Sequence, residues 1–191
     1  MKYLISLAVL VTLLLIGCAD KPISPIESDD QSYQMIKLPP KAGLSIENTF
    51  SVTKRIDGKK GGKITLKKSY NAPDGHKVKI HVELKIKKKS FTGHEDITMT
   101  IDDEFAAICF YPHMVFNKAV ELKAKFEGID LENLGLTGGE YDFVYIAEDG
   151  EIELVEHDRI DVDEHKGKIK FHGRKGHAKL LHFSRYCFIK R

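Results

Sequence analysis

Tryptophan is absent from the 191 residues, and only three cysteines and six prolines occur. No two cysteines form a Cys-x-x-Cys pair, which excludes a zinc knuckle and a thioredoxin-like redox motif. The phosphate-loop pattern is missing as well, because Asp57 stands where its first glycine is required and Ile64 where it needs a hydroxyl. The sequence therefore predicts no metal site and no cofactor.

Long hydrophobic runs are also scarce. The run Leu4–Ile16 follows a single Lys2 and is shorter than the roughly 20 residues that span a bilayer, which is typical of a signal peptide. The segment Leu15-Ile16-Gly17-Cys18 resembles a bacterial lipobox, in which the cysteine is diacylated and becomes the mature N-terminus. We predict a signal peptide over 1–17 and lipidation of Cys18. An uncleaved anchor, or an ordinary signal peptide with an incidental Cys18, is the alternative.

Lipidation predicts a location in the bacterial cell envelope, with the membrane as a partner through Cys18. Two or more acyl chains would hold the protein firmly, because each buried methylene contributes ~0.8 kcal/mol. Ala19 rather than Asp follows the cysteine. In a Gram-negative cell this favours the outer membrane over the inner one.

Residues 18–48 are rich in Pro, Ser and Asp and lack apolar periodicity, which predicts a flexible, disordered tether. The remaining 49–191 is a normal size for one domain. An exported compartment would permit a disulfide between Cys109 and Cys187, and two buried thiols are the alternative.

Alternation of apolar and polar residues is the strongest pattern in the domain. From Val78 to Ile86 the even positions are apolar, which specifies a strand whose five inward side chains contribute on the order of 10 kcal/mol if buried. The same period returns in later segments that Gly-containing turns separate. The segment 116–128 alternates like a strand although its composition also suits a helix. We predict an all-β, antiparallel two-sheet β-sandwich with a strand at 116–128.

Charge is spread unevenly along the chain. Residues 54–89 hold 13 Lys+Arg against 3 Asp+Glu, residues 92–165 hold 4 against 20, and residues 166–191 hold 9 against none. Antiparallel pairing would set these blocks side by side, so we expect them to neutralise one another. A nucleic-acid binder would gather its excess on one face, so nucleic acid is not predicted as a partner. A polyanion or polysaccharide binder is the alternative, with four lysines as its contacts: Lys85, Lys87, Lys88 and Lys89.

Several motif residues recur in a recognisable order over roughly 50–191. They are Phe110, Pro112, Phe116, Val120, Leu122, His182, Phe183, Ser184 and Tyr186. Their order resembles the ZU-five domain that ankyrins, netrin receptors and zonula occludens proteins share. Two departures are Ile86–Phe91, where a proline-rich turn is usual, and Ala119, where proline is usual. The resemblance implies a non-catalytic binding or structural module with an envelope partner still to be identified.

The resemblance also implies a second alternative, because some similar domains cleave themselves within His-Phe-Ser. The cut would fall between Phe183 and Ser184, with the Ser184 hydroxyl as nucleophile. His157 would be the base, and His182 would orient or polarise. The competing interpretation is that His182 and Ser184 make structural hydrogen bonds while Tyr186 packs like the tyrosine at a sandwich corner.

Overall fold

The computed structural model describes residues 33–42, 50–147 and 150–191. The signal peptide and Cys18 lie outside these residues. The strands are β1 (Gln34–Met35), β2 (Ser51–Asp57), β3 (Gly62–Asn71), β4 (Lys77–Ile86), β5 (His94–Ile101), β6 (Ala107–Tyr111), β7 (Val115–Glu127), β8 (Tyr141–Ile146), β9 (Ile152–Leu154), β10 (Ile160–Asp163), β11 (Lys168–Phe171), β12 (Ala178–His182) and β13 (Arg185–Lys190). A short 3-10 helix covers Glu164–Lys166. Among the described residues no helix is long and apolar enough to cross a membrane.

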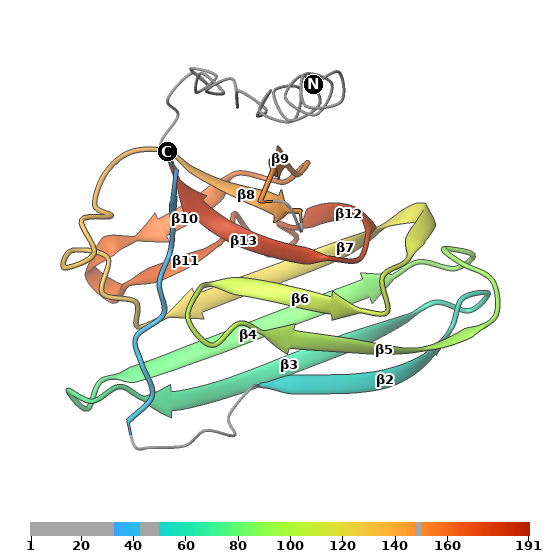
Figure 1. The fold of residues 1–191 in the computed structure, drawn as a ribbon, viewed down its shortest axis with the longest axis horizontal. Helices are drawn as coiled ribbons and strands as arrows, with labels where there is room; N and C mark the ends of the chain where they lie inside the picture. The colour runs from blue at the N-terminus through green and yellow to red at the C-terminus, as the bar shows by residue number, and fades with distance from the viewer. Residues whose placement is uncertain (1–32, 43–49, 148–149) are drawn as a thin grey trace, which may run out of the picture. The chain divides into compact units, whose positions relative to one another are not determined.

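The strands form two antiparallel sheets that face each other (Figure 1). The seven-stranded sheet has the order β2-β5-β6-β13-β8-β9, and β1 also pairs with β13. The six-stranded sheet has the order β10-β11-β7-β4-β3, and β12 also pairs with β7. The predicted all-β two-sheet sandwich is therefore confirmed. The segment 116–128 is a strand, as predicted, since β7 ends at Glu127.

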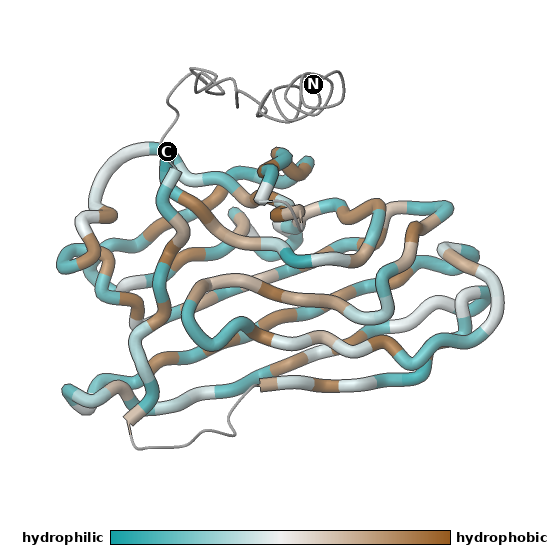
Figure 2. Tube along the Cα trace, viewed as in Figure 1, coloured by the Kyte–Doolittle hydropathy of each residue, from teal (hydrophilic) through white to brown (hydrophobic). Residues whose placement is uncertain are grey.

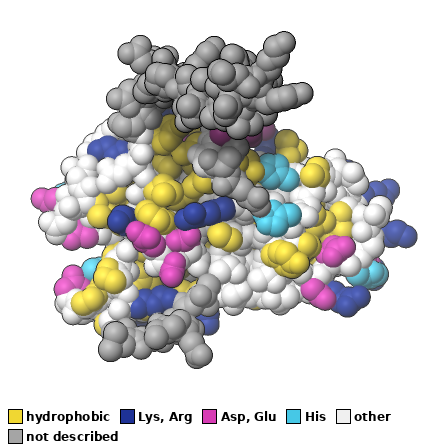
Figure 3. All heavy atoms as spheres, viewed as in Figure 1, with side chains coloured by type: hydrophobic (Ala, Val, Ile, Leu, Met, Phe, Trp, Pro, Cys, Tyr) yellow, Lys and Arg dark blue, Asp and Glu magenta, His cyan; other side chains and the backbone are white. Residues whose placement is uncertain are grey.

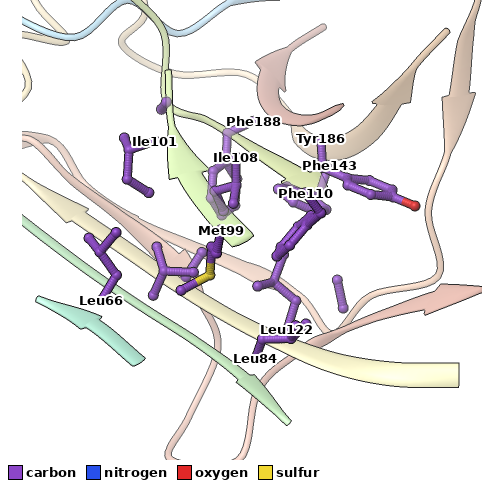
Figure 4. Close-up of a cluster of buried hydrophobic side chains, with 14 of the residues drawn as sticks. Leu66, Leu84, Met99, Ile101, Ile108, Phe110, Leu122, Phe143, Tyr186 and Phe188 are labelled. Atoms are coloured by element: carbon purple, nitrogen blue, oxygen red, sulfur yellow. The ribbon is translucent and has the colours of Figure 1, made fainter. Parts of the chain in front are cut away.

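Alternation places the core between the sheets. In β4 the five even residues are buried, and brown and teal segments alternate along several strands in Figure 2. Leu84 and Leu122 lie opposite each other on β4 and β7, and Figure 4 shows them facing Met99, Phe110 and other side chains of the opposite sheet. Burial of this one continuous cluster supplies the main stabilising contribution to the fold.

Aromatic side chains join the two sheets near β13. Phe143 packs edge-on against Phe171, with ring centroids 5.2 Å apart, and stacks on Tyr186 at 6.0 Å. Phe183 stacks on Phe110 at 4.8 Å and meets Phe116 edge-on at 4.6 Å. Such aromatic pairs each contribute about 0.5–1.5 kcal/mol beyond the area that they bury.

The predicted tether boundary was wrong, because part of 18–48 belongs to the folded domain. β1 pairs with the end of β13, and Ile36 and Leu38 are buried in the core cluster. Leu38 N–H donates to the Glu104 carbonyl at 2.7 Å, which fixes this segment further along the sheet. Sequence composition did not reveal this segment, because the surrounding Pro, Ser and Asp residues outweigh a single short alternation of apolar and polar residues at 36–38.

Candidate binding surface

The outer face of the six-stranded sheet is the most strongly charged surface of the described domain. Because the inward positions are apolar, the alternate positions carry polar side chains into solvent. Ten lysines point outward: Lys63, Lys67, Lys77, Lys79, Lys85, Lys123, Lys125, Lys168, Lys170 and Lys179. Five carboxylates share the face: Glu83, Glu121, Glu127, Asp161 and Asp163. We call this set the basic face.

Register determines which of these lysines are neutralised. Lys85 pairs directly opposite Glu121 and Lys79 opposite Glu127, so the predicted compensation between charge blocks does occur. It is incomplete, because the ten lysines meet five strand carboxylates and Glu156, which binds Lys179. Among the described residues, no ion pair involves Lys67 or Lys77.

The predicted polyanion contacts at 85–89 are the better compensated end of this face. Glu121 binds the ammonium groups of Lys87 at 2.9 Å and Lys85 at 3.0 Å. The hydrogen bond from Lys87, then that from Lys85, lowers the pKa of Glu121 to about 2. Lys88 and Lys89 lie in a turn, where Lys89 has a positive φ of 63° and its N–H donates to the Gly58 carbonyl. Lys67 and Lys77, which have no ion pair to a described residue, lie instead on the edge strand β3 and at the opposite end of β4 from Lys85.

His81 stands in the middle of the basic face, between two lysines. Its cross-strand neighbours are Lys67 on β3 and Lys125 on β7. Burial, followed by the charge of Lys67, lowers the pKa of His81, which favours the neutral ring. Its Nε2 is buried without a hydrogen-bond partner among the described residues. A buried polar atom of this kind is uncommon, and it marks a place where an acceptor would be stabilising.

Two surface hollows flank His81 and Lys125. The larger, of about 380 Å³, extends toward Lys67, Lys77 and Lys79. The smaller, of about 170 Å³, lies toward the turn between β11 and β12 and includes Arg174 in its wall. Both hollows are open to solvent, so the face can receive an extended chain as well as a small group.

The structure does not bring the predicted self-cleavage residues together. His157 accepts from the Phe143 N–H at 3.3 Å and lies 3.3 Å from an Asp142 carboxylate oxygen. Phe143 pairs with Phe188, four positions along β13 from Ser184, or about 13 Å at 3.3 Å per residue. His157 is therefore out of reach as a base for Ser184, which corrects that assignment.

His182 and Tyr186 are joined by hydrogen bonds that stabilise the chain between β12 and β13. The Tyr186 hydroxyl donates to the His182 carbonyl at 2.6 Å and lies 3.3 Å from His182 Nδ1. Ser184 is buried, and its carbonyl accepts from the Phe110 N–H. No hydrogen bond joins the His182 ring to Ser184 in the described part of the chain. This is the corner-like packing that was the competing interpretation of the motif.

The two remaining cysteines are free thiols on the seven-stranded sheet. They lie on neighbouring strands, but Cys109 pairs opposite Arg185 and Cys187 opposite Ala107. The offset of two residues makes them diagonal neighbours rather than direct ones, which is a longer separation than the ~3.8 Å between Cβ atoms that a disulfide needs. Burial raises the pKa of Cys187 to about 12. The possible disulfide is not formed in this structure.

Comparisons with known proteins add no assignment. No protein-family model, curated protein sequence or solved structure matches the chain. Sequence reasoning missed the importance of His81, Lys123 and Arg174, which come from separate segments. The one available signal was that each lies at a polar position of an alternating strand or in the glycine-containing turn at 172–177.

Proposed function

We propose that the protein is a lipid-anchored, non-catalytic binding module of a bacterial envelope, and that its basic face binds an anionic polysaccharide. The observation that carries the proposal is the excess of ten lysines over five strand carboxylates and Glu156 on one face of one sheet. Neighbouring strands lie about 4.8 Å apart and alternate residues about 6.6 Å apart, so the lysines form a regular grid. A polymer with evenly repeated negative groups complements such a grid.

Polysaccharide fits this face better than nucleic acid does. Binding of single-stranded nucleic acid uses aromatic side chains on which bases stack, with each base contributing about 1–3 kcal/mol. No Phe, Tyr or Trp points outward from β3, β4, β7, β10, β11 or β12 within the described residues. The face therefore offers charge without stacking. An exported location, as the lipobox-like segment implies, also favours an envelope polymer.

Anchoring through Cys18 and a ZU-five-like origin of the sandwich are parts of the same proposal. The lipobox-like segment supports the first. The second is supported by the packing of Phe110, Phe116 and Phe183 around the corner that Tyr186 closes. Mass spectrometry of the protein expressed in a lipoprotein-processing bacterium tests the anchor. We expect a chain that begins at an acylated Cys18, and an unmodified Cys18 would contradict it.

Retention on immobilised heparin, used as a model anionic polysaccharide, tests the binding. We expect full-length protein to be retained at low salt and released steeply as salt rises, because binding releases counterions. The Lys67→Glu/Lys77→Glu variant should lose about 100-fold in affinity. Arg55→Glu is the matched control, because Arg55 points outward from the other sheet and should leave retention unchanged.

Two outcomes would overturn the proposal. Retention of the double variant equal to that of the wild type would show that the basic face is not the binding surface. Stronger binding to single-stranded DNA than to heparin at equal salt would show that the polymer class is wrong.

A further inference from the structure

The smaller hollow beside His81 is shaped by the turn that joins β11 to β12. Its wall includes the backbone of Gly173 and Gly176, and its floor includes Ala124 and Phe171. A Cβ on Gly176 would lie 2.0 Å from the His172 carbonyl oxygen, so this position of the turn requires glycine. The turn places Arg174 beside β7, where the Arg174 carbonyl accepts a hydrogen bond from Lys123.

Four cationic side chains from three segments line this hollow. Lys123 and Lys125 come from β7, Lys170 from β11 and Arg174 from the turn. The Lys123 ammonium donates to the Arg174 carbonyl at 3.1 Å, which holds strand and turn together. Among its described lining residues Glu83 is the only carboxylate, and Lys63 already binds it at 2.8 Å. The hollow thus has a strong positive potential over a small volume.

Compensation from outside the hollow is partial. Lys125 pairs with Glu127 at 2.6 Å and Lys170 with Asp161 at 3.4 Å, and both carboxylates lie outside the lining. No described carboxylate pairs with Arg174 or with Lys123. Lys123 nevertheless lies directly opposite Glu83 across β4 and β7, and its charge contributes to lowering the pKa of Glu83. Arg174 is therefore the cation that a ligand could bind with the least loss of existing interactions.

His81 adds a ring nitrogen to the same hollow. Its direct cross-strand neighbours are lysines, and Nε2 has no hydrogen-bond partner among the described residues. Its charged surroundings are Lys63 and Lys67 on β3, Lys79 and Glu83 on β4, and Lys123 and Lys125 on β7. Lysine side chains have several staggered rotamers, so the lysines around the ring can rearrange when an anion enters.

We propose that this hollow is a subsite for a tetrahedral oxyanion, a phosphate or sulfate group that the polymer carries. The inference rests on the proposed function, and it specifies which anionic groups the basic face prefers. Cations that approach from β7, from β11 and from the turn suit an anion with three or four acceptor oxygens. A carboxylate presents its acceptor sites in one plane, so it suits cations that approach from three directions less well.

A comparison of two polymers of matched length and charge density tests the subsite. One is dextran sulfate, in which each sulfate group has three terminal oxygens, and the other is carboxymethyl dextran, and affinity for full-length protein is measured by calorimetry at constant salt. We expect dextran sulfate to bind about tenfold more tightly. The Lys123→Gln/Arg174→Gln variant should lose this preference, because its affinity for dextran sulfate falls about tenfold and its affinity for carboxymethyl dextran about twofold.

The matched control is Lys77→Gln with Lys67→Gln, which removes two charges from the same face outside the smaller hollow. This variant should lose the same factor in affinity for both polymers, so the preference of one polymer over the other should remain. If wild-type protein binds neither polymer, the proposed function itself fails. If wild-type protein binds both polymers equally well, the basic face binds polyanions and the subsite is refuted. The subsite is also refuted if the two double variants show the same loss of affinity for both polymers.

Nuclear magnetic resonance of the His81 ring gives an independent readout with inorganic sulfate, which does not titrate near neutral pH. An oxyanion near Nε2 stabilises the protonated ring, so we expect sulfate to raise the pKa of His81. The same titration of His113 is the control, because His113 lies in the β6–β7 loop outside the hollow. A pKa of His81 that does not respond to sulfate would contradict the subsite.

Discussion

The two sheets have similar interiors and very different outer faces. The basic face carries ten lysines, whereas the outward strand positions of the seven-stranded sheet carry two arginines, Arg55 and Arg185, and three aspartates. Figure 3 views the molecule from the side of the seven-stranded sheet, where hydrophobic, acidic and basic side chains are interspersed. Hydroxyl groups and a second hydrophobic cluster around Val144 and Cys187 occupy much of this neutral face.

The comparison teaches that the fold constrains the two outer faces differently. Inward positions must be apolar in both sheets, since burial of those side chains holds the sheets together. Outward positions of the seven-stranded sheet include the buried apolar cluster of Ala107, Val144, Cys187 and Ile189, whereas outward positions of the six-stranded sheet are free of that requirement. The lysine excess on the six-stranded sheet therefore supports the proposed binding role, since burial does not require it.

After the loss expected from Lys67→Glu/Lys77→Glu itself, the next largest effect comes from moving positive charge to the neutral face. In the Lys67→Glu/Lys77→Glu background, the substitutions Thr53→Lys, Asp96→Asn and Thr100→Lys should raise affinity for heparin at least tenfold. The reason is that counterion release depends on how many cations one face gathers. Retention and its salt dependence are the measurements. An absence of recovery in a folded protein would show that the arrangement of the natural lysines matters beyond their number.

Much of the fold could be predicted because alternation is local. The apolar even positions of β4 and β7 are sufficient to indicate strands with one buried face. The docked β1 could not be predicted, because its pairing with β13 joins residues more than 150 positions apart. Strand order has the same limit, since no local signal states that β4 lies between β3 and β7.

The candidate site was harder to predict, because it depends on register. The sequence suggested that basic and acidic blocks would neutralise each other, and Lys85 with Glu121 shows that they do in part. β7, however, lies in the acidic block and still directs Lys123 and Lys125 onto the basic face. One residue of difference in register would exchange inward and outward positions, so only the folded structure shows which lysines remain uncompensated.

A smaller effect on stability is expected from Glu121, which binds Lys85 and Lys87 at one end of the basic face. Because the folded pKa of Glu121 is depressed to about 2, its stabilising contribution is complete above about pH 4.5 and is lost as the pH falls toward 2. Glu121→Gln should lower the free energy of unfolding by about 1 kcal/mol at pH 7, since its lysine partners are solvent-exposed. Urea unfolding at several pH values measures the difference.

The control for this prediction is Glu132→Gln, which changes an exposed glutamate with no ion pair to a described residue. It should leave stability unchanged at every pH. Glu121→Gln should also strengthen binding to heparin severalfold, because it frees Lys85 and Lys87. A loss of stability that persists undiminished at pH 2 would show that Glu121 acts through packing rather than through its charge.

The smallest expected effect is a difference in salt dependence between the cross-strand polar contacts of the two outer faces. On the neutral face, the Thr53 and Thr98 hydroxyls are 2.8 Å apart across β2 and β5. A double-mutant cycle with Thr53→Val and Thr98→Val should give a coupling of about 0.5 kcal/mol, because valine keeps the branched shape and removes the hydrogen bond. This coupling joins two uncharged groups, so raising the salt concentration should not change it.

The matching cycle on the basic face uses Lys63 and Glu83, whose charged groups are 2.8 Å apart across β3 and β4. Its coupling should be of similar size at low salt and should fall toward zero at about 1 M salt, where the screening length is only about 3 Å. Equal salt dependence of the two cycles would contradict the distinction between the faces. The expected difference means that salt acts on the basic face twice, since it weakens the ion pairs within that face as well as the attraction of the face for a polyanion.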